Sequence, residues 1–307
     1  MITRDDALAL DAADPLASFR DRFHIPNPDV VYLDGNSLGM PPKRTIERLR
    51  EIYEDDWATG LIRSWDHWVD MPQSVGDVLA PLIGAHAGEV VLHDTTTLNV
   101  YQAVHAAIGL RPDRRVIAIS EHDFPTDRYV VDGIAAATGH TVRHGFDRLD
   151  DVAVAVRSVI DYRTAELVDV KAETERATDA GAVVVWDLSH AVGAIDIDLH
   201  DCGVQLAIGC SYKFLNGGPG APAWTFVTRE LQAVVHQPIW GWFATKDQFA
   251  MGPTFEPRPD IARMLLGTPT IMALAAAEGT RVFLYARATA TARRDATTDS
   301  VRPAAEW

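Results

Sequence analysis

The stretch Ser211-Tyr212-Lys213-Phe214-Leu215-Asn216-Gly217-Gly218-Pro219-Gly220 places a lysine between a predicted strand and a glycine-rich turn. A buried lysine is rare, because removing an ammonium group from water is costly unless the charge is paired or neutralised. One reason to bury Lys213 is covalent chemistry, since an uncharged amine can form a Schiff base with an aldehyde. The glycines would let the backbone pass close to a bound group. Taken alone, the segment favours the simpler interpretation of a surface lysine in a turn.

Composition limits the class of protein. The 307 residues are 47% hydrophobic and 23% charged, which is typical of a soluble globular chain with one large or two ordinary domains. The net charge of −15 argues against binding to nucleic acid or to anionic membranes. Residues 1–14 do not have the pattern of a signal peptide, and no apolar run is long enough for a membrane span. We therefore expect a cytoplasmic protein.

The two cysteines, Cys202 and Cys210, lie in one apolar stretch. They are interpreted as buried thiols rather than a disulfide, and their spacing is not that of a metal site.

Short β-rich runs alternate with helical stretches. The predicted strands are Val116–Ser120, Val152–Val159, Val183–Trp186, Val204–Ile208 and Ala223–Val227. The predicted helices between them are Asp127–Thr138 and Asp169–Ala180. This alternation indicates βαβ units and a mostly parallel sheet flanked by helices, which is an α/β fold. In such sheets ligands bind beyond the carboxyl ends of the strands, so the residues that follow each strand are the candidates for a site.

Three further segments suggest ligand contacts. Asp94–Thr97 precedes a helical pattern, and free amides and hydroxyls at a helix N-terminus can bind phosphate. Plain N-capping by Asp94 or a threonine is the commoner alternative. Asp187 ends an apolar strand and could pair with a protonated ring nitrogen, with His190 near enough to assist, or it could cap the next turn. Phe124 could stack on a flat ring with Asp127 at its edge, although this segment alone favours a core phenylalanine before a proline-started helix.

Together these segments supply the parts of one cofactor site in a workable chain order. They offer a phosphate cup, a stacking ring, an acid for a pyridine nitrogen and a lysine for a Schiff base. The group that needs all four is pyridoxal 5'-phosphate (PLP). Several weak signals that converge on one cleft are stronger evidence for a site than any one of them.

The chain also resembles a known family, the kynureninases, which are PLP-dependent hydrolases of aspartate aminotransferase fold. The segments that carry the resemblance are Tyr32–Gly39 (YLDGNSLG), Phe124–Asp127 (FPTD), Asp161–Thr164 (DYRT), Trp186–His190 (WDLSH), Cys210–Asn216 (CSYKFLN) and Gly241–Phe243 (GWF). They extend from about residue 30 to about residue 280. Phosphate-binding threonines and a Schiff-base lysine occur in many PLP families, whereas GNSLG, DLSH and GWF together are more specific.

The resemblance implies a role for each matching residue. Lys213 is the implied Schiff-base lysine, Asp187 the pyridine-nitrogen acid, and Tyr212 a phosphate contact that donates or relays a proton. The other implied cofactor contacts are Thr96, Thr97, Phe124, Pro125, Thr126, Asp127, Ser158, His190, Trp242 and Thr268. Val159 departs from the family pattern, in which histidine is usual at that position. The residues implied near the substrate are Asn36, Ser37 and Trp65. Metal ligands are not implied.

The resemblance implies hydrolysis of the Cβ–Cγ bond of L-kynurenine or 3-hydroxykynurenine, giving anthranilate or 3-hydroxyanthranilate and L-alanine. It places the chain in tryptophan catabolism and NAD biosynthesis, and it implies a homodimer in which Trp65, Trp242 and Thr268 are candidates for crossing the interface. Two alternatives stay open. One is another enzyme of the same fold, such as a cysteine desulfurase or lyase, which would need a reactive cysteine on a mobile loop. The other is a PLP-binding remnant without turnover.

The domain prediction assigns residues 1–60 to the substrate side and the small domain, and residues 61–284 to the large PLP-binding domain. The tail 285–307 is rich in alanine, threonine and arginine, and is expected to be disordered or weakly helical. In the family a small C-terminal domain supplies an arginine for the substrate α-carboxylate. None of Arg287, Arg293, Arg294 and Arg302 matches that arginine, so this domain is expected to be incomplete and turnover to be poor.

Overall fold

The computed structural model describes residues 2–279, and its centre is a sheet. The strands described are β1 (Val90–His93), β2 (Val116–Ile119), β3 (Thr141–His144), β4 (Val152–Ser158), β5 (Val183–Asp187), β6 (Leu206–Gly209) and β7 (Ala223–Val227). Within these residues they form one seven-stranded sheet in the order β1-β7-β6-β5-β4-β2-β3. Strand β7 is antiparallel to both of its neighbours, and the other pairs are parallel. The predicted α/β fold with a mostly parallel sheet is confirmed.

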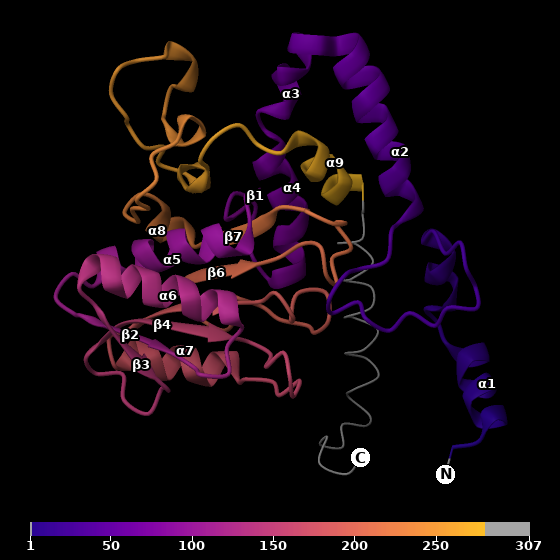
Figure 1. Cartoon of the computed structure of the whole chain (residues 1–307), viewed down its shortest axis with the longest axis horizontal. Coiled ribbons are helices and arrows are strands. Elements are labelled where there is room, and N and C mark those ends of the chain that lie inside the picture. Colours follow the sequence, from indigo (N-terminus) through magenta and orange to yellow (C-terminus); the bar gives the residue numbers. More distant parts are fainter. Residues whose placement is uncertain (1, 280–307) are drawn as a thin grey trace.

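Helices cover both faces of this sheet (Figure 1). The α-helices described are α1 (Arg4–Ala13), α2 (Lys43–Glu51), α3 (Trp65–Trp68), α4 (Met71–Leu79), α5 (Thr96–Leu110), α6 (Pro125–Thr138), α7 (Val170–Asp179), α8 (Arg229–Gln232) and α9 (Ile271–Gly279). The π-helical segment η2 (Ile52–Gly60) continues α2. The 3-10 segments are η1 (Ala17–Arg22), η3 (Leu61–Ser64), η4 (Ala80–Ile83), η5 (Trp242–Ala244), η6 (Gln248–Ala250) and η7 (Ile261–Met264).

The central strands are apolar throughout because their side chains alternate between two faces of the sheet that are both covered. In β5, Val183 and Val185 pack in the same cluster as α5 and α6, whereas Val184 and Trp186 pack in the cluster that contains α7 residues. Successive side chains of a strand point to opposite faces, and here both faces are covered by helices. Every residue of β5 is buried, including Asp187 at its carboxyl end. The sheet thus carries a carboxylate to its edge from inside the core.

The five predicted strands are all present, with their ends shifted by at most two residues. Strand β6 begins at Leu206 rather than Val204, because the Val204 amide donates to Leu199 O in a turn. Helix α6 begins at Pro125, two residues before the predicted start. Strands β1 and β3 were not predicted. The predicted tail, residues 285–307, lies outside the described residues.

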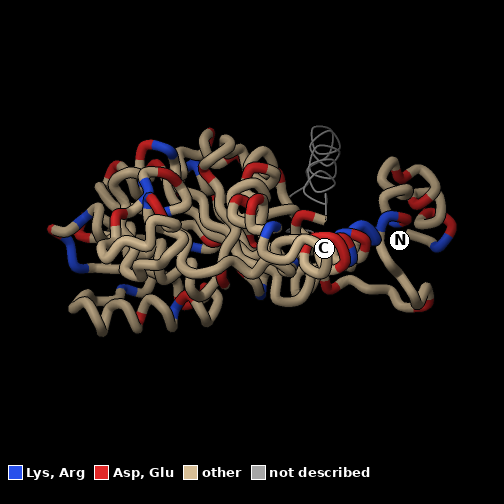
Figure 2. Tube along the Cα trace, turned by 90° about the horizontal axis from the view of Figure 1, so that it is seen from above, with Lys and Arg blue, Asp and Glu red and all other residues tan. Residues whose placement is uncertain are grey.

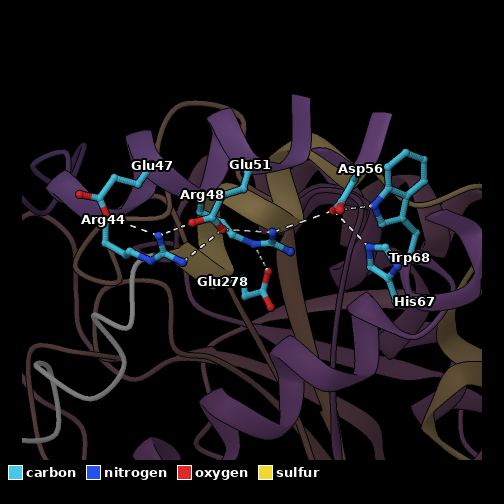
Figure 3. A network of polar contacts seen from close by, with 8 residues as sticks. All are labelled: Arg44, Glu47, Arg48, Glu51, Asp56, His67, Trp68 and Glu278. Carbon is cyan, nitrogen blue, oxygen red and sulfur yellow. Dashed lines mark hydrogen bonds and ion pairs between the residues drawn. The ribbon is translucent and has the colours of Figure 1, made fainter. Parts of the chain in front are cut away.

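The N-terminal segment extends away from the main body (Figure 2). Helix α1 has no buried residue, so little apolar packing holds it to the rest of the described chain. Helix α2, by contrast, packs against α9 (Figure 3). Arg48 Nε donates to Glu278 Oε2 at 2.7 Å, and Arg48 Nη1 lies 3.9 Å from Asp56. Asp56 also accepts from His67 at 3.1 Å and from Trp68 at 3.4 Å.

Two sequence predictions about cysteines and membranes can be compared with the structure. Cys210 is buried as predicted, but Cys202 is only partly buried, so the prediction of two buried thiols was wrong for Cys202. Cys202 lines an open cavity beside the N-terminus of α7, which leaves one side of it accessible. Both cysteines are free thiols.

No helix among residues 2–279 is long and apolar enough to cross a membrane.

Candidate active site

A cavity of about 200 Å³ lies at the carboxyl ends of β5 and β6, where the loop after β6 meets the N-termini of α5 and α6. Polar side chains and one aromatic ring make up most of its wall. The residues that line it are Thr95, Thr96, Thr97, Phe124, Thr126, Asp127, Asp187, Ser189, His190, Tyr212 and Lys213. The structure therefore brings nine of the predicted site residues together in one cavity. Parallel strands of this kind of fold present their ligand sites at the same edge.

Lys213 is buried, with 7% of its surface exposed. Its Nζ atom lies 2.7 Å from His190 Nε2, 5.5 Å from the centre of the Phe124 ring and 5.7 Å from the centre of the Tyr212 ring. Burial lowers the pKa of His190, and the charge of Lys213 lowers it further. A neutral imidazole can therefore accept a hydrogen bond from the lysine ammonium. This contact holds the amine in the cavity.

Two buried carboxyl groups face the same cavity. Asp187 is 4% exposed and accepts a hydrogen bond from the Ser189 amide at 2.7 Å. Asp127 is 1% exposed, and neither of its oxygens has a hydrogen-bond partner among the described residues. Burial raises the pKa of Asp127 well above its ordinary value, and the charges of Asp187 and Asp123 raise it further. Unsatisfied carboxyl oxygens beside a second carboxylate call for a cationic hydrogen-bond donor.

Hydroxyl groups and a helix N-terminus form another part of the wall. The side chain of Thr95 caps α5 by accepting from the Leu98 amide at 3.4 Å, so neither Asp94 nor the next threonines are used as the cap. Thr97 Oγ1 lies 3.2 Å from Thr126 Oγ1, which brings the starts of α5 and α6 together. The first amides of a helix with 15 residues are strong donors to an anion.

The wall of the cavity fits PLP. The adjacent Asp127 and Asp187 match a protonated pyridine nitrogen with a polar ring edge, and Lys213 matches the aldehyde. The threonines at the start of α5 match the phosphate, and Phe124 offers a ring beside the lysine. Each chemical group of the cofactor thus has a counterpart in the chain.

The glycine at position 39 brings the predicted substrate segment against the lysine loop. Gly39 N donates to Tyr212 O at 2.9 Å. A Cβ atom on Gly39 would overlap Lys213 O and Asn216 Oδ1, so only glycine allows this approach. The neighbouring Asn36 and Ser37 are exposed and do not line the cavity. Their assignment to the substrate stays a prediction.

The remaining predicted residues lie outside the cavity. Pro125 starts α6. Ser158 lines a neighbouring cavity of about 190 Å³ that also contains Asp123, and its amide donates to Asp123 Oδ1 at 3.1 Å. Trp65 packs on Trp68 with ring centres 5.6 Å apart. The other two predicted contacts, Trp242 and Thr268, are both exposed.

Two lining residues, Thr95 and Ser189, were not among the predicted site residues. Ser189 accepts from the Cys210 amide at 3.2 Å through its hydroxyl, which ties the end of β5 to the start of the lysine loop. Thr95 lies in the segment Asp94–Thr97 and Ser189 in Trp186–His190, which were both predicted to contact a ligand. Their positions just after a strand could have identified them. Within residues 2–279 no cluster of three histidine, cysteine or acidic side chains could hold a metal ion.

Solved structures with the same fold include a cysteine desulfurase from Thermococcus onnurineus, at 18% identity with a TM-score of 0.71, covering 91% of this chain and 70% of that one. A mutant of C-DES with glycine covalently linked to its PLP cofactor matches at 16% identity with a TM-score of 0.74, covering 88% of this chain and 74% of that one. The sheet and its helices therefore have the fold of a class of PLP enzymes. No family model matches the chain.

Curated relatives identify the family within that class. A kynureninase from Pseudomonas fluorescens is 43% identical over 295 residues, which cover 91% of this chain and 70% of the relative. A kynureninase from Burkholderia pseudomallei is 41% identical over 293 residues, again 91% of this chain and 70% of the relative. The chain belongs to the kynureninase family.

Proposed function

We propose that this protein is a PLP-dependent hydrolase that converts L-kynurenine and water to anthranilate and L-alanine. The observation that carries the proposal is the single cavity in which Lys213, the Asp127–Asp187 pair and the threonines of α5 meet. Membership of the kynureninase family supports the choice of substrate. The reaction belongs to tryptophan catabolism, and 3-hydroxykynurenine is the natural second substrate to compare.

The chain's own residues account for the proton transfers. PLP, when bound, supplies an electron-withdrawing ring that stabilises negative charge on the substrate. Asp187 and Asp127 would hold the edge of that ring, and the start of α5 would hold the phosphate. Lys213 would hold the aldehyde group, and its amine would be the base placed to take the α-proton of the substrate. His190 keeps the lysine nitrogen in place through the contact at 2.7 Å.

Tyr212 is the proposed proton donor for the leaving carbon. Burial, the largest cause, raises the pKa of Tyr212 to about 12. The phenol therefore stays protonated at neutral pH and can give its proton to Cβ when the Cβ–Cγ bond breaks. Water provides the oxygen that remains on the γ-carbon as the carboxylate of anthranilate. One water molecule is thus added across the broken Cβ–Cγ bond, with a hydrogen on Cβ and its oxygen on the γ-carbon.

Two measurements on the PLP-loaded protein test the proposal. Borohydride reduction followed by peptide mass spectrometry should place the cofactor on Lys213, and incubation with L-kynurenine should release anthranilate. Lys213→Ala should lose both signals. Lys171→Ala is a matched control, since Lys171 on α7 lies outside the active-site cavity. A label on a different lysine would reject the site, and a label on Lys213 without anthranilate would reject the hydrolase activity.

The likeness to cysteine desulfurase structures does not favour desulfurase activity for this chain. Their identity to this chain is below 20%, so the likeness concerns the fold. Desulfurase chemistry needs a reactive cysteine close to the cofactor, and neither cysteine lines the active-site cavity. Burial raises the pKa of both Cys202 and Cys210, which makes each a poor nucleophile at neutral pH. Two free thiols fit a reducing compartment, and we place the protein in the cytoplasm on that ground.

We also propose a homodimer. The arm formed by η2 and η3 and the segment after α8 both project beyond the sheet layers (Figure 1). They expose large apolar side chains: Tyr53, Trp57, Leu61, Ile62, Trp240, Phe249 and Met251. Large exposed apolar side chains on projecting segments are typical of a protein interface. Trp242 and Thr268, which lie outside the cavity of their own chain, fit contacts to the cofactor of a partner. Light scattering over a concentration series tests this, and a stable monomer that keeps PLP would refute it.

A further inference from the structure

The segment Asp161–Thr164 (DYRT) carries part of the family resemblance, but the proposed function gives it no role. It belongs to the loop that follows β4, which is neither of the two segments proposed for the dimer interface. Hydrogen bonds within the chain fix this loop. Asp161 Oδ1 accepts from the Arg163 amide at 2.8 Å, and the Asp161 amide donates to Glu166 O at 3.0 Å. The backbone that carries Tyr162 is therefore held in place by its own loop.

The side chain of Tyr162 connects this loop to the active-site cavity. Its ring meets the Phe124 ring edge to face, with centres 5.1 Å apart and planes inclined by 74°. It also lies nearly parallel to the His190 imidazole, with centres 6.4 Å apart and planes inclined by 21°. Since the Phe124 and His190 rings are themselves 6.3 Å apart, the three rings form one cluster. Phe124 and His190 line the cavity, whereas Tyr162 stands behind them.

The two neighbours of Tyr162 are also the neighbours of the lysine amine. Lys213 Nζ lies 2.7 Å from His190 Nε2 and 5.5 Å from the centre of the Phe124 ring. Aromatic rings at such separations prefer edge-to-face or offset arrangements, and these contacts stabilise beyond the area that they bury. A third ring that touches both neighbours therefore restrains their orientation. It acts at once on the ring that would lie against the cofactor and on the imidazole that holds the lysine.

We propose that Tyr162 is a positioning residue of the active site, which orients the Phe124 ring for stacking on PLP and holds the His190 imidazole against Lys213. This inference rests on the proposed function, because it needs the cofactor to bind in this cavity. The contacts that support it all lie within one chain. Both contacts of Tyr162 are made by its ring, so the ring rather than the hydroxyl group carries the role.

Two variants separate the ring from the hydroxyl group. Tyr162→Ala removes the ring and should weaken PLP binding about 2–10-fold in an absorbance titration, which is the contribution of one aromatic pair. Tyr162→Phe keeps the ring and should bind PLP as the parent does. Tyr129→Ala is the matched control, since Tyr129 is an exposed tyrosine on α6 that does not line the cavity.

A double-mutant cycle tests whether Tyr162 acts through Phe124. In a Phe124→Leu background Tyr162→Ala should have little further effect on PLP affinity, because the ring that Tyr162 orients is already gone. A loss of affinity as large as in the parent background would show that the two rings act independently, and would overturn the proposal.

The cofactor-free protein gives a second readout. Burial is the main cause that lowers the pKa of His190, the charge of Lys213 lowers it further, and the charge of Asp187 raises it. Tyr162→Ala should let water reach the imidazole, so that the pKa of His190 rises toward its ordinary value in an NMR titration of the labelled ring. Tyr162→Phe should restore the parent titration, which a general loss of stability would not explain.

The two readouts distinguish this inference from the proposed function. A parent protein that does not bind PLP would reject the proposed function, and the NMR titration would then decide whether Tyr162 holds the His190 imidazole. Where the parent binds PLP, unchanged PLP affinity in Tyr162→Ala would overturn the inference. An unchanged His190 titration in that variant would overturn it in either case.

Discussion

Replacement of Asp187 by asparagine tests the most specific feature of the site. Asparagine keeps the size of the side chain and can still accept the hydrogen bond that the Ser189 amide gives at 2.7 Å. It removes the negative charge that, in the proposed site, would keep the pyridine nitrogen of PLP protonated. Loss of that charge also removes the second cause that raises the pKa of Asp127, so Asp127 ionises more readily and partly replaces it.

The size of the effect follows from the type of hydrogen bond. A bond to a charged group contributes roughly 1.5–3 kcal/mol and a neutral one roughly 0.5–1.5 kcal/mol. Asp187→Asn should therefore cost about 1–2 kcal/mol in PLP binding, or about 5–30-fold in affinity. The compensation by Asp127 favours the lower end of this range. Exchange of the substrate α-proton should fall about tenfold or more beyond that, because only a cationic ring withdraws electrons efficiently.

Two assays separate the effects. Absorbance titration gives PLP affinity, and NMR in deuterated water gives α-proton exchange at saturating cofactor. Asp123→Asn is the matched control, because Asp123 is a buried carboxyl group in the neighbouring cavity that accepts from the Ser120 and Ser158 amides. It should affect stability more than exchange. Small and equal losses of affinity and exchange in Asp187→Asn would mean that Asp187 does not face the ring.

Three further predictions concern the scaffold. Gly39→Ala should cost about 1–3 kcal/mol in unfolding free energy, because its Cβ would overlap the carbonyl of the active-site lysine, whereas Gly109→Ala, with open space around it, should be neutral or stabilising in the same thermal melt. Arg48→Met should lower the thermal midpoint by about 2–6 °C through loss of the ion pair between α2 and α9, and Arg50→Met on the same helix should not. Burial lowers the pKa of His105, so the folded protein favours the neutral imidazole. The contribution of His105 to unfolding free energy is therefore fully present above about pH 6.5 and is lost as pH falls below that value. His105→Gln should lose less thermal stability between about pH 7.5 and about pH 5.5 than the parent protein does.

The strands that could be predicted from sequence are those buried on both faces. Strand β5 begins with three valines, and its predicted end at Trp186 is one residue before the observed end at Asp187. Strand β1 has only four residues, three of them apolar, and so short a run does not distinguish a strand from a helix by periodicity. Strand β3 lies at the edge of the sheet and has no buried residue, so its sequence carries almost no hydrophobic signal.

The residues of the site could be predicted where chain order and strand ends coincide. Lys213, Asp187, Phe124 and the threonines at the start of α5 all lie within a few residues of a strand end or a helix start. Trp242 and Thr268 could be named only through the family resemblance. They follow no strand of the sheet, and in one chain they do not reach the cavity. In the proposed homodimer their place would depend on contacts between chains, which no local pattern in one sequence encodes.

The arrangement of charge explains why the site is assembled from four separate elements. Two carboxyl groups come from β5 and α6, an ammonium from the loop after β6, and helix amides from α5. Without a cofactor these groups oppose folding, since Asp127 and Asp187 repel each other and Lys213 has a neutral partner at 2.7 Å. PLP supplies a cationic ring edge, an anionic phosphate and an aldehyde, one for each group. Because PLP would bind the folded chain and not the unfolded one, its binding should stabilise the fold. The same complementarity that prepares the chemistry therefore also holds the ends of the sheet and its helices together.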